Sequence, residues 1–241
     1  MAFWDSPASC SLARRVDAVM ASKLPESVPA TSVDRQCGSS QQALHFAAQA
    51  VMAGSMDIVI AAGVEGMTRV PMGLPATLAA KNGFGNYYSP GIQAKYPNIQ
   101  FSQFTGAEMM AEKYGLSKDE LDQYSYQSHQ KAIAATQAGA FKDEIVPLKF
   151  TREDGSSDIH SIDEGIRFDA TIEGIRGVKT IAEGGKLTAA SASQICDGAS
   201  GVMIVNERGL KALGIAPLAR IHRMTMIGGD PVIMLEAPLP A

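Results

Sequence analysis

The chain has 241 residues and a formal net charge of −4, so its composition gives no indication of a nucleic acid or an anionic membrane surface as a partner. Its three cysteines, Cys10, Cys37 and Cys196, cannot all pair with one another and lack zinc-ligand spacing. We therefore expect no metal site and a reducing, cytoplasmic compartment. No apolar run is long enough to cross a bilayer, and the first residues lack the form of a signal peptide.

The first part of the sequence predicts a strand, a tight turn, a buried helix and a second strand. Apolar and small residues recur at helical spacing after residue 41, with Ser39 or Ser40 as the capping residue and Gly54 at the end. The expected elements are an irregular start over 1–11, a helix over 11–22, an extended segment over 30–33, a helix over 41–54 and a strand over 58–63.

Cys37 falls between the extended segment and the long helix. The macrodipole and the unpaired N–H groups of a helix start favour a thiolate, which is the form that attacks carbonyls and thioesters. The Gly38 N–H is then a candidate donor to an oxyanion. On the residues alone, a buried structural cysteine remains the alternative.

The rest of the chain alternates loops, helices and short strands. Ser117 and Glu120 have the spacing of a capping box, and Asn206 is expected to cap a helix that runs to Leu213. Cys196 is expected to be a small packing residue. The other expectations are loops over 71–104, helices over 108–114 and 117–138, strands over 145–150 and 157–160, a small-residue turn over 198–201 and a last strand over 219–227.

Several segments, in order, resemble those of thiolases, the acetyl-CoA C-acyltransferases. The similar segments are 34–43 (DRQCGSSQQA), 63–73 (GVEGMTRVPMG), 105–108 (TGAE), 128–132 (SHQKA), 141–147 (FKDEIVP) and 188–199 (TAASASQICDGA). The resemblance extends from about residue 12 to the end of the chain, and it strengthens the interpretation of Cys37 as a nucleophile.

The resemblance implies an α/β fold class, with a thiolase-like N-terminal domain of αβα layers around a mixed sheet. An α/β loop domain that holds CoA is expected as an insertion, and the C-terminal half of the αβαβα fold is expected to be missing. The implied boundaries are 1–69 and 188–241 for the two parts of the N-terminal domain and 70–187 for the loop domain.

Thiolases transfer an acyl group between CoA thioesters through a cysteine, as in fatty acid β-oxidation. The family activates that cysteine with the histidine of a Gly-His-Pro motif, and a second cysteine lies in Cys-x-Gly-Gly. Neither motif occurs in these 241 residues. His45 lies about 12 Å from Cys37 along the helix axis, beyond hydrogen-bond reach, and all four histidines are expected to be structural or exposed. We therefore expect little turnover by this chain alone.

The resemblance further implies that acyl-CoA and CoA are substrates and that no cofactor is tightly bound. For each candidate contact, the residue type alone also fits turn capping, solvated charge or loop packing. The candidate CoA-binding residues are Ser193, Ser191, Arg167, Arg176, Lys179, Gln103 and Phe104.

A homo-oligomer, either a dimer or a tetramer, is expected, because half of this fold leaves apolar faces uncovered. The resemblance further implies that residues 58–62 lie near the contact, since thiolases associate near the strand that follows the catalytic helix. Two other functions stay open. One is a β-ketoacyl synthase-like condensing enzyme, and the other is a non-catalytic fragment that binds CoA or dimerises.

Overall fold

The computed structural model describes residues 2–5 and 14–241, and within it the chain forms two compact units. The first unit comprises residues 1–97 and 195–226, and the second comprises 98–194 and 227–241. The division into 1–69, 70–187 and 188–241 that the resemblance implies stays a prediction. Among the described helices, none combines the length and the apolar character needed to cross a membrane.

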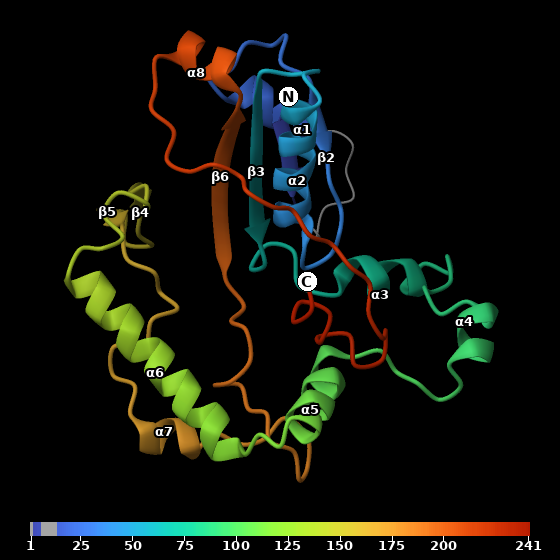
Figure 1. Ribbon diagram of the computed structural model, residues 1–241. Coiled ribbons are helices and arrows are strands. Elements are labelled where there is room, and N and C mark those ends of the chain that lie inside the picture. Colours follow the sequence, from blue (N-terminus) through green and yellow to red (C-terminus); the bar gives the residue numbers. More distant parts are fainter. Residues whose placement is uncertain (1, 6–13) are drawn as a thin grey trace. The chain divides into compact units, whose positions relative to one another are not determined.

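The first unit is built on a four-stranded sheet. Its strands are β1 (Ala2–Asp5), β2 (Ala30–Ser32), β3 (Ile58–Gly66) and β6 (Asp197–Val205), in the order β2-β1-β3-β6. Strand β1 is parallel to β2 and to β3, whereas β6 is antiparallel to β3 over its whole length. Figure 1 shows β3 and β6 side by side as the two long strands. The mixed sheet is confirmed.

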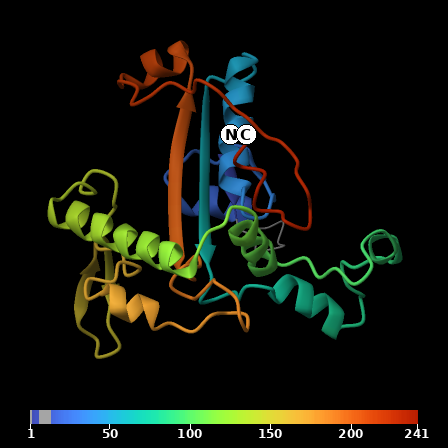
Figure 2. The ribbon, with the colours of Figure 1, turned by 60° about the horizontal axis from the view of Figure 1, so that its bottom comes forward.

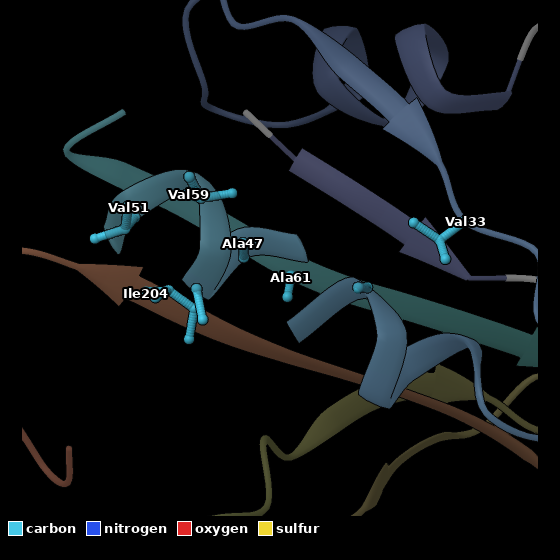
Figure 3. Packing of buried hydrophobic residues seen from close by; sticks show 8 residues of the cluster. Val33, Ala47, Val51, Val59, Ala61 and Ile204 are labelled. Atoms are coloured by element: carbon cyan, nitrogen blue, oxygen red, sulfur yellow. The ribbon is translucent and has the colours of Figure 1, made fainter. Parts of the chain in front are cut away.

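Helix α2 (Ser39–Met52) packs its small side chains against this sheet. Short side chains let a helix approach a strand closely, and on β3 the buried Val59 and Ala61 alternate with partly exposed neighbours. Helix α1 (Arg14–Ala21) contacts β2 and confirms the expected helix from Arg14 onward, since residues 11–13 lie outside the described part. The buried cluster in Figure 3 consists of Val33, Ala43, Ala47, Ala48, Val51, Val59, Ala61 and Ile204.

Two expectations for segments of this sheet are wrong. Residues 2–5 are not irregular but form β1, because β2 and β3 supply hydrogen-bond partners on both sides of this short segment. The small residues 198–201 are not a turn but lie inside β6. Each of them is paired with a residue of β3, and this ladder outweighs the low strand propensity of glycine.

Two further expectations in the first unit are also wrong. The supposed loop over 71–104 contains two short helices, α3 (Leu74–Lys81) and α4 (Pro90–Lys95), and each has a proline in its first turn, where its missing N–H costs nothing. The segment 219–227 is not a strand, because it pairs with none of the described strands. Its residues Ile221 and Met224 instead pack against the buried cluster.

The second unit joins helices to a small hairpin, as both views show (Figures 1 and 2). The capping box of Ser117 and Glu120 is confirmed at the start of its longest helix. The hairpin strands are antiparallel and confirm the two predicted strands. The elements are α5 (Gln103–Lys113), α6 (Lys118–Gln137), β4 (Leu148–Thr151), β5 (Ser157–His160) and α7 (Ile172–Arg176).

The last residues of the chain are held on α5. A Cβ at Gly106 would lie 2.6 Å from the carbonyl oxygen of Ile233, so only glycine permits this approach. The Glu236 carboxylate accepts hydrogen bonds from the Lys113 ammonium and the Tyr114 hydroxyl, and these bonds lower the pKa of Glu236.

Helix α8 (Glu207–Leu213) follows β6 and is capped, as predicted, by Asn206, whose side chain accepts from the Gly209 N–H. The carboxylate of Asp57 accepts from the Asn206 amide at 2.6 Å and from the Arg208 guanidinium at 2.7 Å. These hydrogen bonds hold the pKa of Asp57 below its ordinary value, and the bond from Asn206 has the larger effect, followed by those from Arg208.

Acid is expected to remove the stabilisation that Asp57 provides. Because its folded pKa is lowered, the contribution is complete above the unfolded pKa of about 3.9 and is lost as the pH falls through the folded value. Urea unfolding of the parent and of Asp57→Asn should therefore show a stability gap at pH 6 that narrows below about pH 4. A gap that is constant with pH would contradict this role.

Candidate functional site

Cys37 lies exposed in a tight turn immediately before α2. The turn is closed by the Gly38 N–H, which donates to the Arg35 carbonyl at 2.7 Å. The backbone of Cys37 has a φ of 62°, a left-handed conformation that costs a residue with a Cβ about 1–3 kcal/mol. Such strain is often found at functional sites, so the conformation makes Cys37, two residues before the first turn of a buried helix, the candidate for the functional residue of this turn.

Two local expectations for this turn are wrong. The Gly38 N–H is committed to the turn and so is not available to an oxyanion. No serine side chain caps α2, because Gly38 is the capping residue and the buried Ser39 hydroxyl instead accepts from the Arg35 N–H at 3.0 Å. Ser39 therefore fixes the turn to the helix, and the first N–H groups of α2 are left without a side-chain cap.

Arg35 brings a positive charge to the same turn. A Cβ at Gly38 would lie 3.1 Å from a terminal nitrogen of the Arg35 guanidinium, so glycine gives this side chain room within the turn. This place of the Arg35 side chain was not apparent from the sequence, because a turn residue gives no sign of where its side chain lies.

The two histidines of the first unit differ in burial. His45 is buried in α2, eight residues after Cys37 in sequence, whereas His222 is exposed. Cys196, which was expected to be packed, has an exposed side chain in front of β6. Among the described residues, no group of three or more His, Cys, Asp or Glu side chains could hold a metal ion.

All the candidate CoA-binding residues belong to the second unit. Arg167 and Lys179 are exposed, and Gln103 begins α5 with Phe104 partly exposed beside it. Arg176 differs from Arg167 because its guanidinium makes an ion pair with Asp119 at 2.7 Å. Among the described residues Arg167 makes no ion pair, so its charge is the less neutralised of the two.

The candidate serines lie in and after a turn at 188–191. The Ser191 hydroxyl accepts from the Thr188 N–H at 2.9 Å and donates to the Thr188 carbonyl, so it serves the turn. Ser193 follows the turn and is exposed. Thr188 itself is fully buried, and its hydroxyl accepts from two further N–H groups of the turn. The segment that carries Ser193 is thus well fixed at its start.

Glu108 anchors the strand-like segment before that turn and was missed as a structural residue. Its carboxylate accepts from the N–H groups of Lys186 and Leu187 at 2.8 to 3.0 Å. A Cβ at Gly185 would meet the same carboxylate. Glu108 belongs to the segment TGAE, which resembles a thiolase segment, but no residue near it in sequence indicates a contact with residues 186 and 187.

A mixed sheet with a helix packed on it, and an exposed cysteine in a strained turn ahead of that helix, place this chain in the class of α/β proteins. Comparison with known proteins identifies the member of that class. Residues 9–208 match the family model described as "Thiolase, N-terminal domain". The chain belongs to the thiolase family.

Individual relatives agree with this assignment. A steroid 3-ketoacyl-CoA thiolase of Mycobacterium tuberculosis is 43% identical over 224 residues, which cover 92% of this chain and 54% of that protein. A 3-ketoacyl-CoA thiolase of Cronobacter sakazakii is 37% identical over 227 residues, covering 93% of this chain and 56% of the relative. The chain spans about half the length of these curated relatives.

A solved structure confirms the predicted fold class. The acetyl-CoA acetyltransferase of Bacillus anthracis superposes with a TM-score of 0.80 and 28% identity, over 96% of this chain and 60% of the other.

Proposed function

We propose that this chain carries the acyl-accepting half of a thiolase active site, with Cys37 as the residue that takes the acyl group from an acyl-CoA. The Cys37 sulfur attacks the thioester carbonyl carbon, the bond from that carbon to the CoA sulfur breaks, and CoA leaves as a thiol after taking up a proton. The observation that carries the proposal is the exposed Cys37 in its left-handed turn at the start of α2.

The substrates are proposed to be CoA thioesters, either 3-ketoacyl-CoA for cleavage or acetyl-CoA for condensation. The names of the relatives support this choice, since each is a thiolase or an acetyltransferase of CoA. Arg167 and Ser193 are proposed as the main CoA contacts, with Ser191, Arg176, Lys179, Gln103 and Phe104 as further members of that site. The cytoplasm is the proposed compartment, because three cysteines cannot all pair.

Selective alkylation tests the nucleophile. Iodoacetamide is expected to modify Cys37 at least about tenfold faster than Cys196, because both thiols are exposed but Cys37 precedes a helix and Cys196 precedes a strand. Excess acetyl-CoA should slow the modification of Cys37 alone. Rates are followed by peptide mass spectrometry.

Matched variants separate this proposal from its alternative. Cys196→Ser should leave the fast reaction intact, and Cys37→Ser should remove it. Equal rates at the two cysteines would overturn the nucleophile and leave a fragment that only binds CoA or dimerises. A fast Cys37 that is protected by acyl carrier protein thioesters but not by acetyl-CoA would instead favour a synthase-like enzyme.

The proposed oligomer is a dimer in which two β6 strands pair around a twofold axis. Strand β3 has partners on both sides, so residues 58–62 cannot accept a further strand. Strand β6 is paired only with β3 among the described residues, and a nine-residue edge strand is a template for pairing.

A charge on this edge strand is expected to separate the dimer. Val202 of β6 is 49% exposed and Val64 of β3 is 54% exposed, which makes them a matched pair. Val202→Lys should yield a monomer at micromolar concentration by light scattering, whereas Val64→Lys should not. A parent that is already monomeric would refute the dimer, and dissociation by Val64→Lys alone would move the interface away from β6.

A further inference from the structure

The turn at residues 163–167 is held by two side chains from distant parts of the second unit. The Arg167 N–H donates to Nδ1 of His129, a half-buried residue of α6, at 3.3 Å. The side-chain amide of Gln194 donates to the Gly165 carbonyl at 2.7 Å. Neither contact is local, since 38 and 29 residues separate the partners.

The same turn is also shaped from within. The Asp163 carboxylate accepts from the Gly165 N–H at 2.8 Å. A Cβ at Gly165 would lie 2.6 Å from the Gln194 side-chain oxygen, so the absence of a side chain lets the Gln194 amide lie directly on the backbone. The turn therefore has a defined conformation in which each bond fixes a backbone atom within two residues of Arg167.

These bonds connect two of the proposed CoA contacts. Gln194 directly follows Ser193, and Gly165 comes two residues before Arg167. The Gln194 bond thus joins the segment of the exposed serine to the turn of the exposed arginine. On the other side, His129 ties that turn to the rigid helix α6.

We infer that His129 and Gln194 are positioning residues for CoA, which fix the backbone that carries Arg167 next to the segment of Ser193. The inference rests on the proposed role of Arg167 and Ser193 in CoA binding. Without these bonds Arg167 would have to be ordered on binding, and the cost of that ordering would reduce the affinity. His129 acts here through its neutral form, because an Nδ1 that accepts a hydrogen bond carries no proton.

Two amide replacements at His129 test the geometry without removing polarity. The side-chain oxygen of asparagine can take the place of Nδ1, whereas the glutamine amide extends to the place of Nε2. His129→Gln is expected to weaken binding of CoA by about three- to tenfold, the effect of one lost hydrogen bond. His129→Asn should restore most of the affinity, which a merely space-filling ring would not allow. Binding is measured by calorimetry on the whole chain.

A second readout does not depend on CoA. Amide hydrogen exchange at Arg167, followed by NMR without ligand, should be faster in His129→Gln than in the parent and close to the parent rate in His129→Asn. Gln194→Ala should weaken CoA binding to a similar degree as His129→Gln. These results would support both positioning residues.

The possible failures are distinguishable. If the parent binds no CoA, or if Arg167→Gln binds as well as the parent, the proposed CoA site fails and the inference falls with it. If Arg167→Gln weakens binding at least about tenfold while His129→Gln and Gln194→Ala bind normally, the CoA site stands and the positioning role is overturned. Equal losses in His129→Asn and His129→Gln would also overturn it.

Discussion

Extending this chain with the C-terminal half of a thiolase is expected to raise acetoacetyl-CoA cleavage about 10²- to 10⁴-fold over the chain alone. The physical reason is that the first unit places Cys37 at a helix start, whereas the Gly-His-Pro motif with which the family activates its cysteine does not occur in these 241 residues. General base catalysis by the histidine of Gly-His-Pro would then supply the missing proton transfer. Cleavage is followed by the loss of acetoacetyl-CoA absorbance.

The matched control carries the same added half with the histidine of its Gly-His-Pro motif changed to asparagine. That protein should fall back close to the level of the chain alone, although its mass and its contacts are unchanged. Equal cleavage by the chain alone and by the extended protein would refute the dependence on an added base.

In the extended protein, Cys37→Ser is expected to lower cleavage by at least about 10³-fold. A serine hydroxyl at the same position is far less acidic than a thiol, so a helix start does not convert it into an anion. Cys196→Ser is the control, since that cysteine is equally exposed but follows no such turn, and it should retain full activity. Comparable losses in the two variants would assign the effect to folding rather than to the nucleophile.

Local signals in the sequence predicted the architecture around Cys37 well. The helical spacing of the alanines predicts a buried helix, and the apolar run after Asp57 predicts a buried strand. The structure has these elements as α2 and β3. The capping residues Ser117 and Asn206 also have a local chemistry that the sequence shows directly. These features depend on neighbours within a few residues, so one sequence is enough to predict them.

Features that depend on distant partners were missed. Strand β1 exists because β2 and β3 flank it, and the glycines of β6 are extended because each faces a residue of β3. The apolar residues at 219–227 resemble a strand, but no strand is there to pair with them. The strand propensity of single residues does not predict which segments pair with one another.

The candidate site shows the same difference between local features and features that depend on distant partners. The helix that follows Cys37 was predicted from local spacing, and the role of Cys37 itself stays a prediction. The bond that removes the Gly38 N–H from oxyanion binding is a feature of turn geometry that the sequence does not show. His129 and Gln194 hold the Arg167 turn across 38 and 29 residues of sequence, and nothing in the residues near them marks such contacts.

The most direct test is to find the acyl group on the protein. After incubation with acetyl-CoA and rapid acid quenching, intact mass followed by peptide mapping should show one acetyl group on Cys37, none on Cys10 or Cys196, and none on Cys37→Ser. An unmodified Cys37 under conditions in which acetyl-CoA protects it from iodoacetamide, or an acetyl group on another cysteine, would contradict the assignment of Cys37 as the acyl-accepting residue.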